Sequence, residues 1–237
     1  FINIRENYNN GELDGLYEKF YRSSSQLESR KNYKNGTEEG LQEEFFDNGQ
    51  LQEKRNIENG ELVLHQTFDQ EGNPINDLTY INGKKTGVEV MFHYNGQLEN
   101  RGNYKKGQLD GLLEMFDVNG QLSKRVNYKD GKLDGLSEWF RENGQLEFRG
   151  NYKKGQLDGF YEGFDENGQL KERENYKDGE PDGLYERYRD NGQLKERGNY
   201  KNGERDGLFE WFDVNGDLTE TEEYENGKEL NKIIFTY

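Results

Sequence analysis

The sequence predicts an all-β protein, an elongated antiparallel array of successive β-hairpins that form a single-layer or twisted open sheet. Three observations predict it: the 237 residues repeat about every 24 residues, each repeat holds two short aromatic-rich segments, and glycines separate these segments. Short alternating segments bounded by Asn-Gly or Asp-Gly are typical of strands joined by hairpin turns. Helices are disfavoured because glycine would interrupt every candidate helix about every ten residues.

The composition indicates an ordered chain with a thin core. Only 30% of the residues are hydrophobic, 34% are charged and the formal net charge is −16, which is typical of disordered proteins. The chain nevertheless contains 16 Tyr and 14 Phe, and aromatic side chains bury a large area each. We therefore expect a folded protein with much solvated surface.

The repeat is measured from the glycine that closes each "NYKxG" segment, and the intervals are 23 to 25 residues. These glycines are Gly11, Gly36, Gly60, Gly83, Gly107, Gly131, Gly155, Gly179, Gly203 and Gly227. We predict one domain over residues 1–237, with a half repeat at 1–10, repeats at 11–227 and a closing strand at 228–237. Such a regular period is the signature of a stacked repeat architecture.

The register within a hairpin follows from its hydrophobic pattern. A three-residue loop, Val118-Asn119-Gly120 with the glycine as a bulge residue, sets Phe116 opposite Leu122 and Leu112 opposite Val126. A two-residue turn would scatter the apolar residues. We therefore predict the three-residue loop.

On this register one face of the sheet carries the recurring apolar residues. In one repeat they are Leu136, Phe140, Leu146 and Tyr152. Stacking of hairpins would turn them into continuous rows in which each repeat covers its neighbour.

A recurring glutamate lies among these apolar residues, at Glu18, Glu43, Glu114, Glu138, Glu162, Glu186 and Glu210. Burial of like charges in a row is unfavourable. Either these carboxylates accept hydrogen bonds from turn N–H groups or from a recurring arginine, or they lie at an open edge. A catalytic carboxylate pair needs two different environments, whereas a periodic row supplies identical ones, so we interpret the row as structural.

The repeat from Gly60 to Gly83 is irregular. Leu64 replaces a glycine, Pro74 replaces the leucine after the turn, and the two histidines, His65 and His93, lie in or just after this repeat. Proline within a strand favours an edge or a bulge. We predict a degenerate repeat with a bulge, and the alternative is a local binding site or a bend.

The second face of each hairpin varies between repeats, and we predict that it binds a partner. The candidate residues are Tyr17, Met115, Trp139, Tyr161, Tyr185, Arg187, Phe209, Trp211 and Arg197. Aromatic residues beside arginine are typical of protein–protein hot spots. The arginine row, including Arg197, is predicted on this same face. The alternative is that this face is merely solvated or packs against a second layer.

Catalysis is not expected. The chain has no cysteine and two histidines, so it offers no thiolate and little from which to assemble a nucleophile and base. The glycines occur at turn positions with a regular period, unlike a phosphate-binding loop. We predict no catalytic, cofactor-binding or metal-binding residues and no cofactor. An acidic surface disfavours nucleic acid and anionic membranes as partners.

The repeat "G-x-x-x-G-L-Y-E-x-F-x-x-N-G-Q-L-x-x-R-x-N-Y-K-x-G" resembles the MORN-type repeat, most closely the bacterial variant-2 form of YwqK-family antitoxins. The resemblance extends from Tyr8 to Gly227 and weakens between Gly60 and Gly83. It implies successive antiparallel hairpins without catalysis, with roles in protein or membrane-surface association or in neutralising a toxin. The family assigns no function to a specific position here.

We therefore expect a non-catalytic scaffold that mediates protein–protein interaction. The alternatives are an antitoxin or immunity protein that neutralises a basic toxin, and a secreted or surface adhesion-related repeat protein. A basic partner suits the net charge, and an exposed N-terminal edge could allow weak self-association. The compartment stays open between the bacterial cytoplasm and, if a signal peptide preceded Phe1, the surface or exterior.

Overall fold

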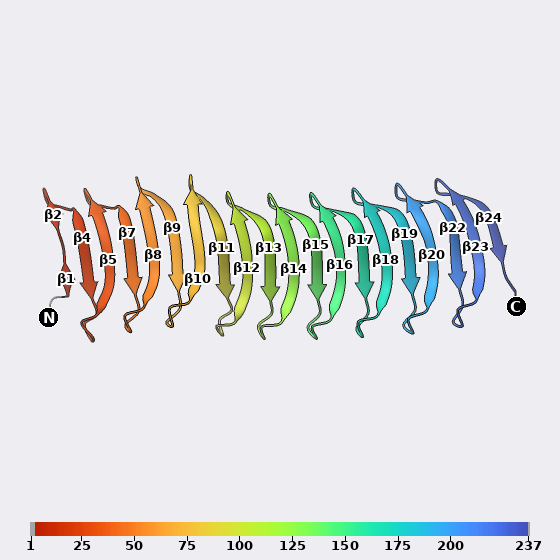
Figure 1. Cartoon of the computed structure of the whole chain (residues 1–237), viewed down its shortest axis with the longest axis horizontal. Helices are drawn as coiled ribbons and strands as arrows, with labels where there is room; N and C mark the ends of the chain where they lie inside the picture. Colours follow the sequence, from red (N-terminus) through yellow and green to blue (C-terminus); the bar gives the residue numbers. More distant parts are fainter. Residues whose placement is uncertain (1–2, 237) are drawn as a thin grey trace. The chain divides into compact units, whose positions relative to one another are not determined.

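The computed structural model describes residues 3–236, so Phe1 and Ile2 of the predicted half repeat and Tyr237 of the predicted closing strand lie outside the described residues. Over residues 3–236 the chain forms 24 strands and no helix. The prediction of an all-β fold made of antiparallel hairpin repeats is confirmed. The chain divides into two compact units, Phe1–Asp110 and Gly111–Tyr237. Within each unit the hairpins follow one another in chain order (Figure 1).

The first unit contains β1 (Ile4–Arg5), β2 (Tyr8–Asn9), β3 (Glu12–Leu13), β4 (Gly15–Phe20), β5 (Leu27–Lys34), β6 (Thr37–Glu38), β7 (Gly40–Phe45), β8 (Leu51–Glu58), β9 (Glu61–Phe68), β10 (Pro74–Ile81), β11 (Lys84–Phe92) and β12 (Leu98–Lys105). β13 (Gln108–Phe116) crosses the boundary between the units. The second unit continues with β14 (Leu122–Lys129), β15 (Lys132–Phe140), β16 (Leu146–Lys153), β17 (Gln156–Phe164), β18 (Leu170–Lys177), β19 (Glu180–Tyr188), β20 (Leu194–Lys201), β21 (Glu204–Arg205), β22 (Gly207–Phe212), β23 (Leu218–Glu225) and β24 (Lys228–Ile234).

The Asn-Gly loop between β13 and β14 has the predicted length. Gly120 has a φ of 83°, and its N–H donates to the carbonyl of Asp117 at 2.9 Å. The N–H of Asp117 in turn donates to the carbonyl of Gln121 at 2.8 Å, and Phe116 pairs with Leu122. This arrangement is a type I turn followed by a glycine bulge, which confirms the three-residue loop.

Beyond this first pair the predicted register is wrong by one residue. The pairing shifts between Met115 and Phe116, so that Val126 lies opposite Leu113 and not opposite Leu112. Ser123 is the extra residue of a β-bulge, and one extra residue moves every later side chain of the strand to the other face. The same shift follows the Asn-Gly loop in the other regular hairpins.

We call one face of each unit the Glu–Arg face. In the hairpin β15–β16 it carries Leu136, Glu138 and Phe140, with Arg149 directly opposite Glu138. The bulge therefore places the recurring arginine beside the recurring glutamate. The prediction that the arginine row shares a face with the variable aromatic residues is wrong.

The other face is called the aromatic face, and in the same hairpin it carries Ser137 and Trp139. Phe148 lies opposite Trp139, and Tyr152 lies opposite Gly135. The tyrosine before the closing glycine was predicted on the face of the recurring leucines. It lies instead on the aromatic face, because the bulge reverses the alternation in β16.

A second irregularity separates consecutive hairpins. Three residues of β15, Asp134 to Leu136, lie opposite the single residue Asn127 of β14. The Asn127 side chain fills the gap, since its Nδ2 donates to the carbonyl of Leu136 at 2.7 Å. The recurring Asn of "NYK" thus satisfies a backbone group that the ladder leaves unpaired.

Each hairpin is also tied to its neighbour through the turns. The N–H of Gly155 donates to the carbonyl of Leu133 at 2.8 Å, one repeat earlier. The Asp134 carboxylate accepts a hydrogen bond from the N–H of Lys154 at 3.3 Å. Equivalent bonds join the repeats at Asp158, Asp182 and Asp206. These contacts explain the recurring Asp-Gly.

The core is thin, as the composition predicts. Among the described residues only Leu78, Val126 and Phe209 are hydrophobic side chains exposed by 3% or less. All three lie on the aromatic face, where Leu78 pairs with Gly87 and Val126 with Ser137. Each fully buried residue therefore lies next to a small one, which leaves room for it within a single layer.

The irregular repeat has a bulge, as predicted, but this bulge is the one that follows the loop in the regular hairpins and so does not set this repeat apart. β10 begins at Pro74, which pairs with Phe68, and the register shifts before Asn76. Pro lacks a backbone N–H and cannot complete the ladder, so the start of a strand beside a bulge accommodates it.

The glycine conformation gives a stability test. Gly159 has a φ of +119°, and a Cβ at this position would lie 3.1 Å from the Cβ of Asn151. Gly155 has a φ of +92°, and apart from its chain neighbours no described residue has a heavy atom within 4 Å of its Cβ position. We expect Gly155→Ala to lower the free energy of unfolding by about 1 kcal/mol through backbone strain, and Gly159→Ala by about 2–3 kcal/mol. Urea unfolding of both variants measures this difference, and equal losses would show that the contact with Asn151 is irrelevant.

Candidate functional site

The glutamate row is neutralised by the arginine row. Glu162 lies between two arginines, with its Oε2 2.7 Å from Nη2 of Arg149 and its Oε1 2.9 Å from Nε of Arg173. Arg125 likewise bridges Glu114 at 3.3 Å and Glu138 at 3.5 Å. Charges alternate along the Glu–Arg face. Of the alternatives that the sequence left open, hydrogen bonding to the recurring arginine is the one that the structure contains.

The ion pairs set the protonation state of Glu162. Burial alone would raise the pKa of this carboxyl, because Glu162 is only 8% exposed. The hydrogen bonds from Arg149 and Arg173 outweigh burial and lower the pKa below its usual 4.5. The carboxylate is therefore ionised at neutral pH, which suits a structural ion pair.

The lowered pKa predicts acid sensitivity. A carboxyl whose pKa is lower in the folded state stabilises the fold above its unfolded pKa, and this contribution is lost as the pH falls through the folded pKa. We expect the wild type to lose stability below about pH 4.5 and Glu162→Gln to lose less over the same range. Urea midpoints between pH 7 and pH 3 measure this. Glu166→Gln, in an exposed turn, is the control and should retain the wild-type slope.

The aromatic face of the second unit contains a continuous run of rings. Trp139 stacks on Phe148 with ring centroids 4.4 Å apart and an interplanar angle of 20°. Phe148 lies 6.1 Å from Tyr161, which lies 6.4 Å from Tyr176. These residues come from β15 to β18, and the side-chain alternation of each strand places them on one side.

Phe209 is the centre of a second cluster on the same face. It is 1% exposed, and its ring lies 5.6 Å from Tyr200 and 5.5 Å from Tyr224. Gly198 makes the burial feasible, because a Cβ there would lie 2.4 Å from the Phe209 ring. The guanidinium of Arg205 covers the ring at 4.7 Å. Phe209 is therefore part of the core.

The structure divides the predicted binding residues into three groups. Half-buried residues of the aromatic face are Tyr17, Met115, Trp139, Tyr161, Tyr185, Arg187 and Trp211. Phe209 is buried, so we remove it from the contact set. Arg197 belongs to the Glu–Arg face, where its Nε donates to Glu210, because the bulge reverses the alternation of β20.

Sequence reasoning missed the carboxylates that lie among these rings. Glu196 accepts hydrogen bonds from the Tyr185 hydroxyl at 2.7 Å and from Nε1 of Trp211 at 2.9 Å. Glu172 pairs with Arg187 at 2.7 Å. Both follow the Asn-Gly loop at a position that varies between repeats, and the bulge brings that position to the aromatic face. A sequence prediction that included the bulge would have placed Glu172 and Glu196 on the aromatic face.

The tyrosines of this face remain protonated. Burial raises the pKa of Tyr161 to about 12, with a further contribution from Glu172. The pKa of Tyr185 is also raised to about 12, first by burial and then by its hydrogen bond to Glu196. These phenols therefore act as hydrogen-bond donors at neutral pH and are poor nucleophiles or bases.

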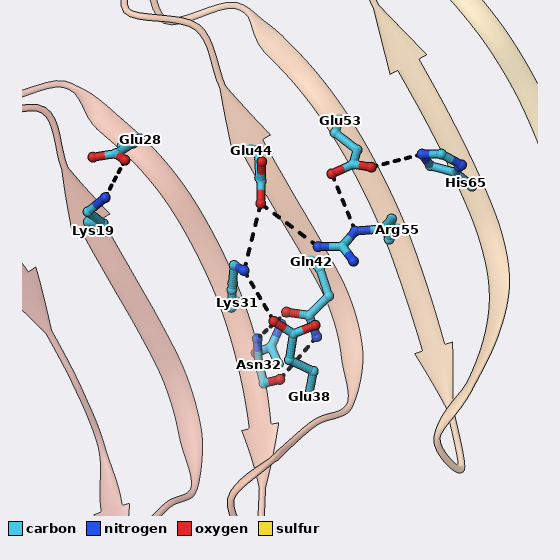
Figure 2. A network of polar contacts seen from close by, with 10 residues as sticks. All are labelled: Lys19, Glu28, Lys31, Asn32, Glu38, Gln42, Glu44, Glu53, Arg55 and His65. Carbon is cyan, nitrogen blue, oxygen red and sulfur yellow. Dashed lines mark hydrogen bonds and ion pairs between the residues drawn. The ribbon is translucent and has the colours of Figure 1, made fainter.

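On the aromatic face of the first unit a network of charged side chains lies beside the Tyr17–Tyr33 pair (Figure 2). Lys19 pairs with Glu28, and Lys31 pairs with Glu38 at 3.1 Å and Glu44 at 3.7 Å. The network continues through Arg55, which lies 3.8 Å from Glu44 and 3.4 Å from Glu53, to His65, whose Nε2 is 2.8 Å from Glu53. Beneath it the amide of Gln42, 1% exposed, donates to the carbonyl of Asn32 at 3.0 Å. The same backbone positions therefore support two different surfaces.

The described residues contain no group of three or more His, Cys, Asp or Glu side chains suited to hold a metal ion. No helix in the described part of the chain is long and apolar enough to cross a membrane.

Fold and site together define a β-hairpin repeat protein. Six segments of the chain match the family model described as the MORN repeat variant, namely residues 38–59, 85–106, 109–130, 133–154, 157–178 and 181–202. They cover more than half of the sequence, and the chain belongs to this family. The unmatched stretch between the first two segments contains the irregular repeat. No curated protein matches the chain.

Among solved structures the chain is similar to an alternansucrase in complex with isomaltononaose, at 18% identity and a TM-score of 0.22. It is also similar to a chain of the Photorhabdus luminescens Tc holotoxin pore, at 11% identity and a TM-score of 0.21. The alignments cover 92% of this chain in both cases but only 16% and 15% of the other chains. The chain thus spans about a sixth of those proteins, and we draw no functional argument from them.

A buried serine tests the packing of the aromatic face. The Ser137 side chain is 0% exposed and its Oγ has no hydrogen-bond partner within residues 3–236, whereas Oγ of Ser123 donates to the carbonyl of Met115 at 3.1 Å. We expect Ser137→Ala to leave the free energy of unfolding unchanged or to raise it by about 1 kcal/mol, and Ser123→Ala to lower it by about 1 kcal/mol. Chemical denaturation compares the two. A clear loss in Ser137→Ala would reveal a bonded hydroxyl.

Proposed function

We propose that the protein is a non-catalytic repeat scaffold that binds a protein partner through its aromatic face. One observation carries this proposal: half-buried tryptophan and tyrosine residues share a face with Arg187, which lies 5.6 Å from the Tyr185 ring, and the residues of this face change from repeat to repeat. Trp, Tyr and Arg are the residue types enriched in interface hot spots. The opposite face repeats its Glu–Arg pairs, so it holds the hairpins together and offers little that distinguishes one position from another.

Membership of a repeat family supports a scaffold role, because such arrays present extended surfaces for binding. The raised pKa values of the tyrosines and the periodic ion pairs of the carboxylates offer no group poised for acid–base chemistry.

A second candidate is neutralisation of a basic protein, as the resemblance to YwqK-family antitoxins implies. The net charge of −16 favours it, because opposite charge accelerates association and disfavours acidic competitors. Partner retention should then fall steeply as salt rises from about 0.05 M to about 0.5 M, since salt screens exposed charges.

Adjacent residues on opposite faces provide the test. Trp139 and Phe140 are consecutive half-buried residues of β15, the first on the aromatic face and the second on the Glu–Arg face. We expect Trp139→Ala and Phe140→Ala to lower stability by comparable amounts, about 2–4 kcal/mol. Only Trp139→Ala should weaken partner retention, by about tenfold or more.

The measurement is affinity capture by the full chain from the cells that produce it, followed by titration of the captured partner against each variant. The temperature is set where both variants are folded by circular dichroism. Equal retention by the two variants, or no partner on the wild type at low salt, would contradict the proposal.

A further inference from the structure

The aromatic face contains two hollows at the same level of a hairpin, one on its first strand and one on its second. One is a cavity of about 400 Å³ beside Gly163, and the other, of about 440 Å³, lies beside Ser29. Gly163 occupies the position of Trp139 one repeat earlier and of Arg187 one repeat later. Ser29 occupies the position of Phe148. Each hollow arises where one hairpin carries a small residue and its neighbours carry large ones.

The hollow at Gly163 has one apolar wall and one charged wall. Phe148, fixed by its stack on Trp139, and the ring of Tyr161 form the apolar side. The Glu172–Arg187 ion pair closes the opposite side. A cavity of this volume lies within the range that protein pockets use for ligands, and its mixed walls suit an apolar group attached to a polar one.

The rim of this hollow is basic, although the chain is acidic. Its lining includes four cationic side chains, Arg141, Lys171, Arg187 and Lys195, against the two carboxylates of Glu147 and Glu172. The whole chain has the opposite balance, 32 basic against 48 acidic residues. A neighbouring depression of about 480 Å³ adds Arg189 and Asp190 to this rim, so the cations of the two linings still outnumber the carboxylates. The hollow is therefore the centre of a local positive patch.

Three of the four cations already have anionic partners within the protein. Arg141 binds Glu147 at 3.0 Å, Lys171 lies 3.2 Å from Asp190, and Arg187 is paired as described above. Lys195 is exposed and makes no ion pair or hydrogen bond with any residue in the described range 3–236. An ammonium group at the mouth of a hollow with one apolar wall is suited to receive a carboxylate.

We propose that the hollow at Gly163 anchors an acidic segment of a protein partner, with an aromatic or aliphatic side chain against Phe148 and an adjacent carboxylate on Lys195. This assignment rests on the proposed function, and it specifies the chemistry of the partner segment that the aromatic face would bind. A basic segment would meet the ammonium of Lys195, unpaired within residues 3–236, at a rim with more cations than carboxylates, and a bare anion would leave the apolar wall exposed. Burial of the apolar side chain would raise the strength of the ion pair beside it by excluding water.

The hollow at Ser29 is the internal comparison. Its lining holds Lys19, Lys31, Glu28 and Glu44, which pair with one another. Its charges are balanced and satisfied, so nothing there favours an anionic ligand.

The experiment selects peptides from a random 12-residue display library on the immobilised full chain, and measures the affinity of the enriched peptides in solution. We expect the enriched peptides to combine an aromatic or large aliphatic residue with neighbouring Asp or Glu. Gly163→Trp fills the hollow with the residue that stands at the equivalent position 139, at the expense of moving Glu172, whose Oε1 lies 2.9 Å from the Cβ position. It should abolish binding. Because it displaces Glu172 from its ion pair with Arg187, it should also lower the melting temperature, so binding is compared at a temperature where circular dichroism shows both the variant and the wild type folded.

A charge reversal outside the packed face keeps the test independent of folding. Lys195→Glu should weaken peptide binding by about tenfold. Lys201→Glu is the matched control, since Lys201 is an exposed lysine on the same strand, β20, near its other end. Lys201→Glu should change peptide affinity by less than about twofold. Because both variants change the net charge equally, a larger effect of Lys195→Glu would show a local contact at Lys195 and not an effect of the total charge.

The outcomes distinguish this inference from the proposed function. Enrichment of basic peptides, no enrichment at all, or equal effects of the two lysine reversals would overturn the acidic anchor. If Trp139→Ala weakens retention of the captured partner but Gly163→Trp and Lys195→Glu do not, the aromatic face binds the partner and the proposed anchor in the hollow is wrong. If Trp139→Ala also leaves retention of the partner unchanged, the proposed function is wrong as well.

Discussion

An open sheet of one layer has no second layer to cover its faces, and the rest of this structure depends on how the chain meets that constraint. Each hairpin contacts only its neighbours, so the side chains of adjacent repeats must cover one another on both sides. The Glu–Arg face does so with alternating charges and phenylalanines. The aromatic face does so with rings that lie over glycine, as Phe209 does over Gly198, and with Val126 beside the small Ser137.

The bulge after each Asn-Gly loop determines which residues serve each face. Without it, arginine and glutamate would lie on opposite sides, and a row of carboxylates would remain without partners. With it, Arg149 and Arg173 flank Glu162, and the tyrosine of "NYK" joins the variable rings. A single extra residue per repeat therefore separates a constant, charge-paired face from a variable one.

The variable face is where the two units differ. The first unit places a network of lysine, glutamate, arginine and histidine there, and the second places stacked rings and a basic hollow. The long-range field of the chain is negative, while the patch around Lys195 is positive. The net charge and the local cations act at different distances. The net charge affects the rate at which a partner approaches, whereas an ion pair at Lys195 would set the position of the partner once it is bound.

Much of the architecture could be read from the sequence, because glycine and Asn-Gly have few conformational options. The period, the hairpins, the loop at Val118–Gly120 and the structural nature of the glutamate row follow from local chemistry. The assignment of faces could not be read this way. Leu112 opposite Val126 satisfied the hydrophobic pattern as well as the true register did, and only the paired strands decide between them.

The sequence by itself therefore determined the unit, its turns and its repetition, since these depend on backbone preferences within a few residues. Only the tertiary structure decided which side chains share a surface, because one bulged residue reverses the alternation of an entire strand. Burial of Phe209 over Gly198, removal of Arg197 from the aromatic face, and the hollow at Gly163 all depend on contacts between repeats. Such contacts are set by packing between strands, which no single segment specifies.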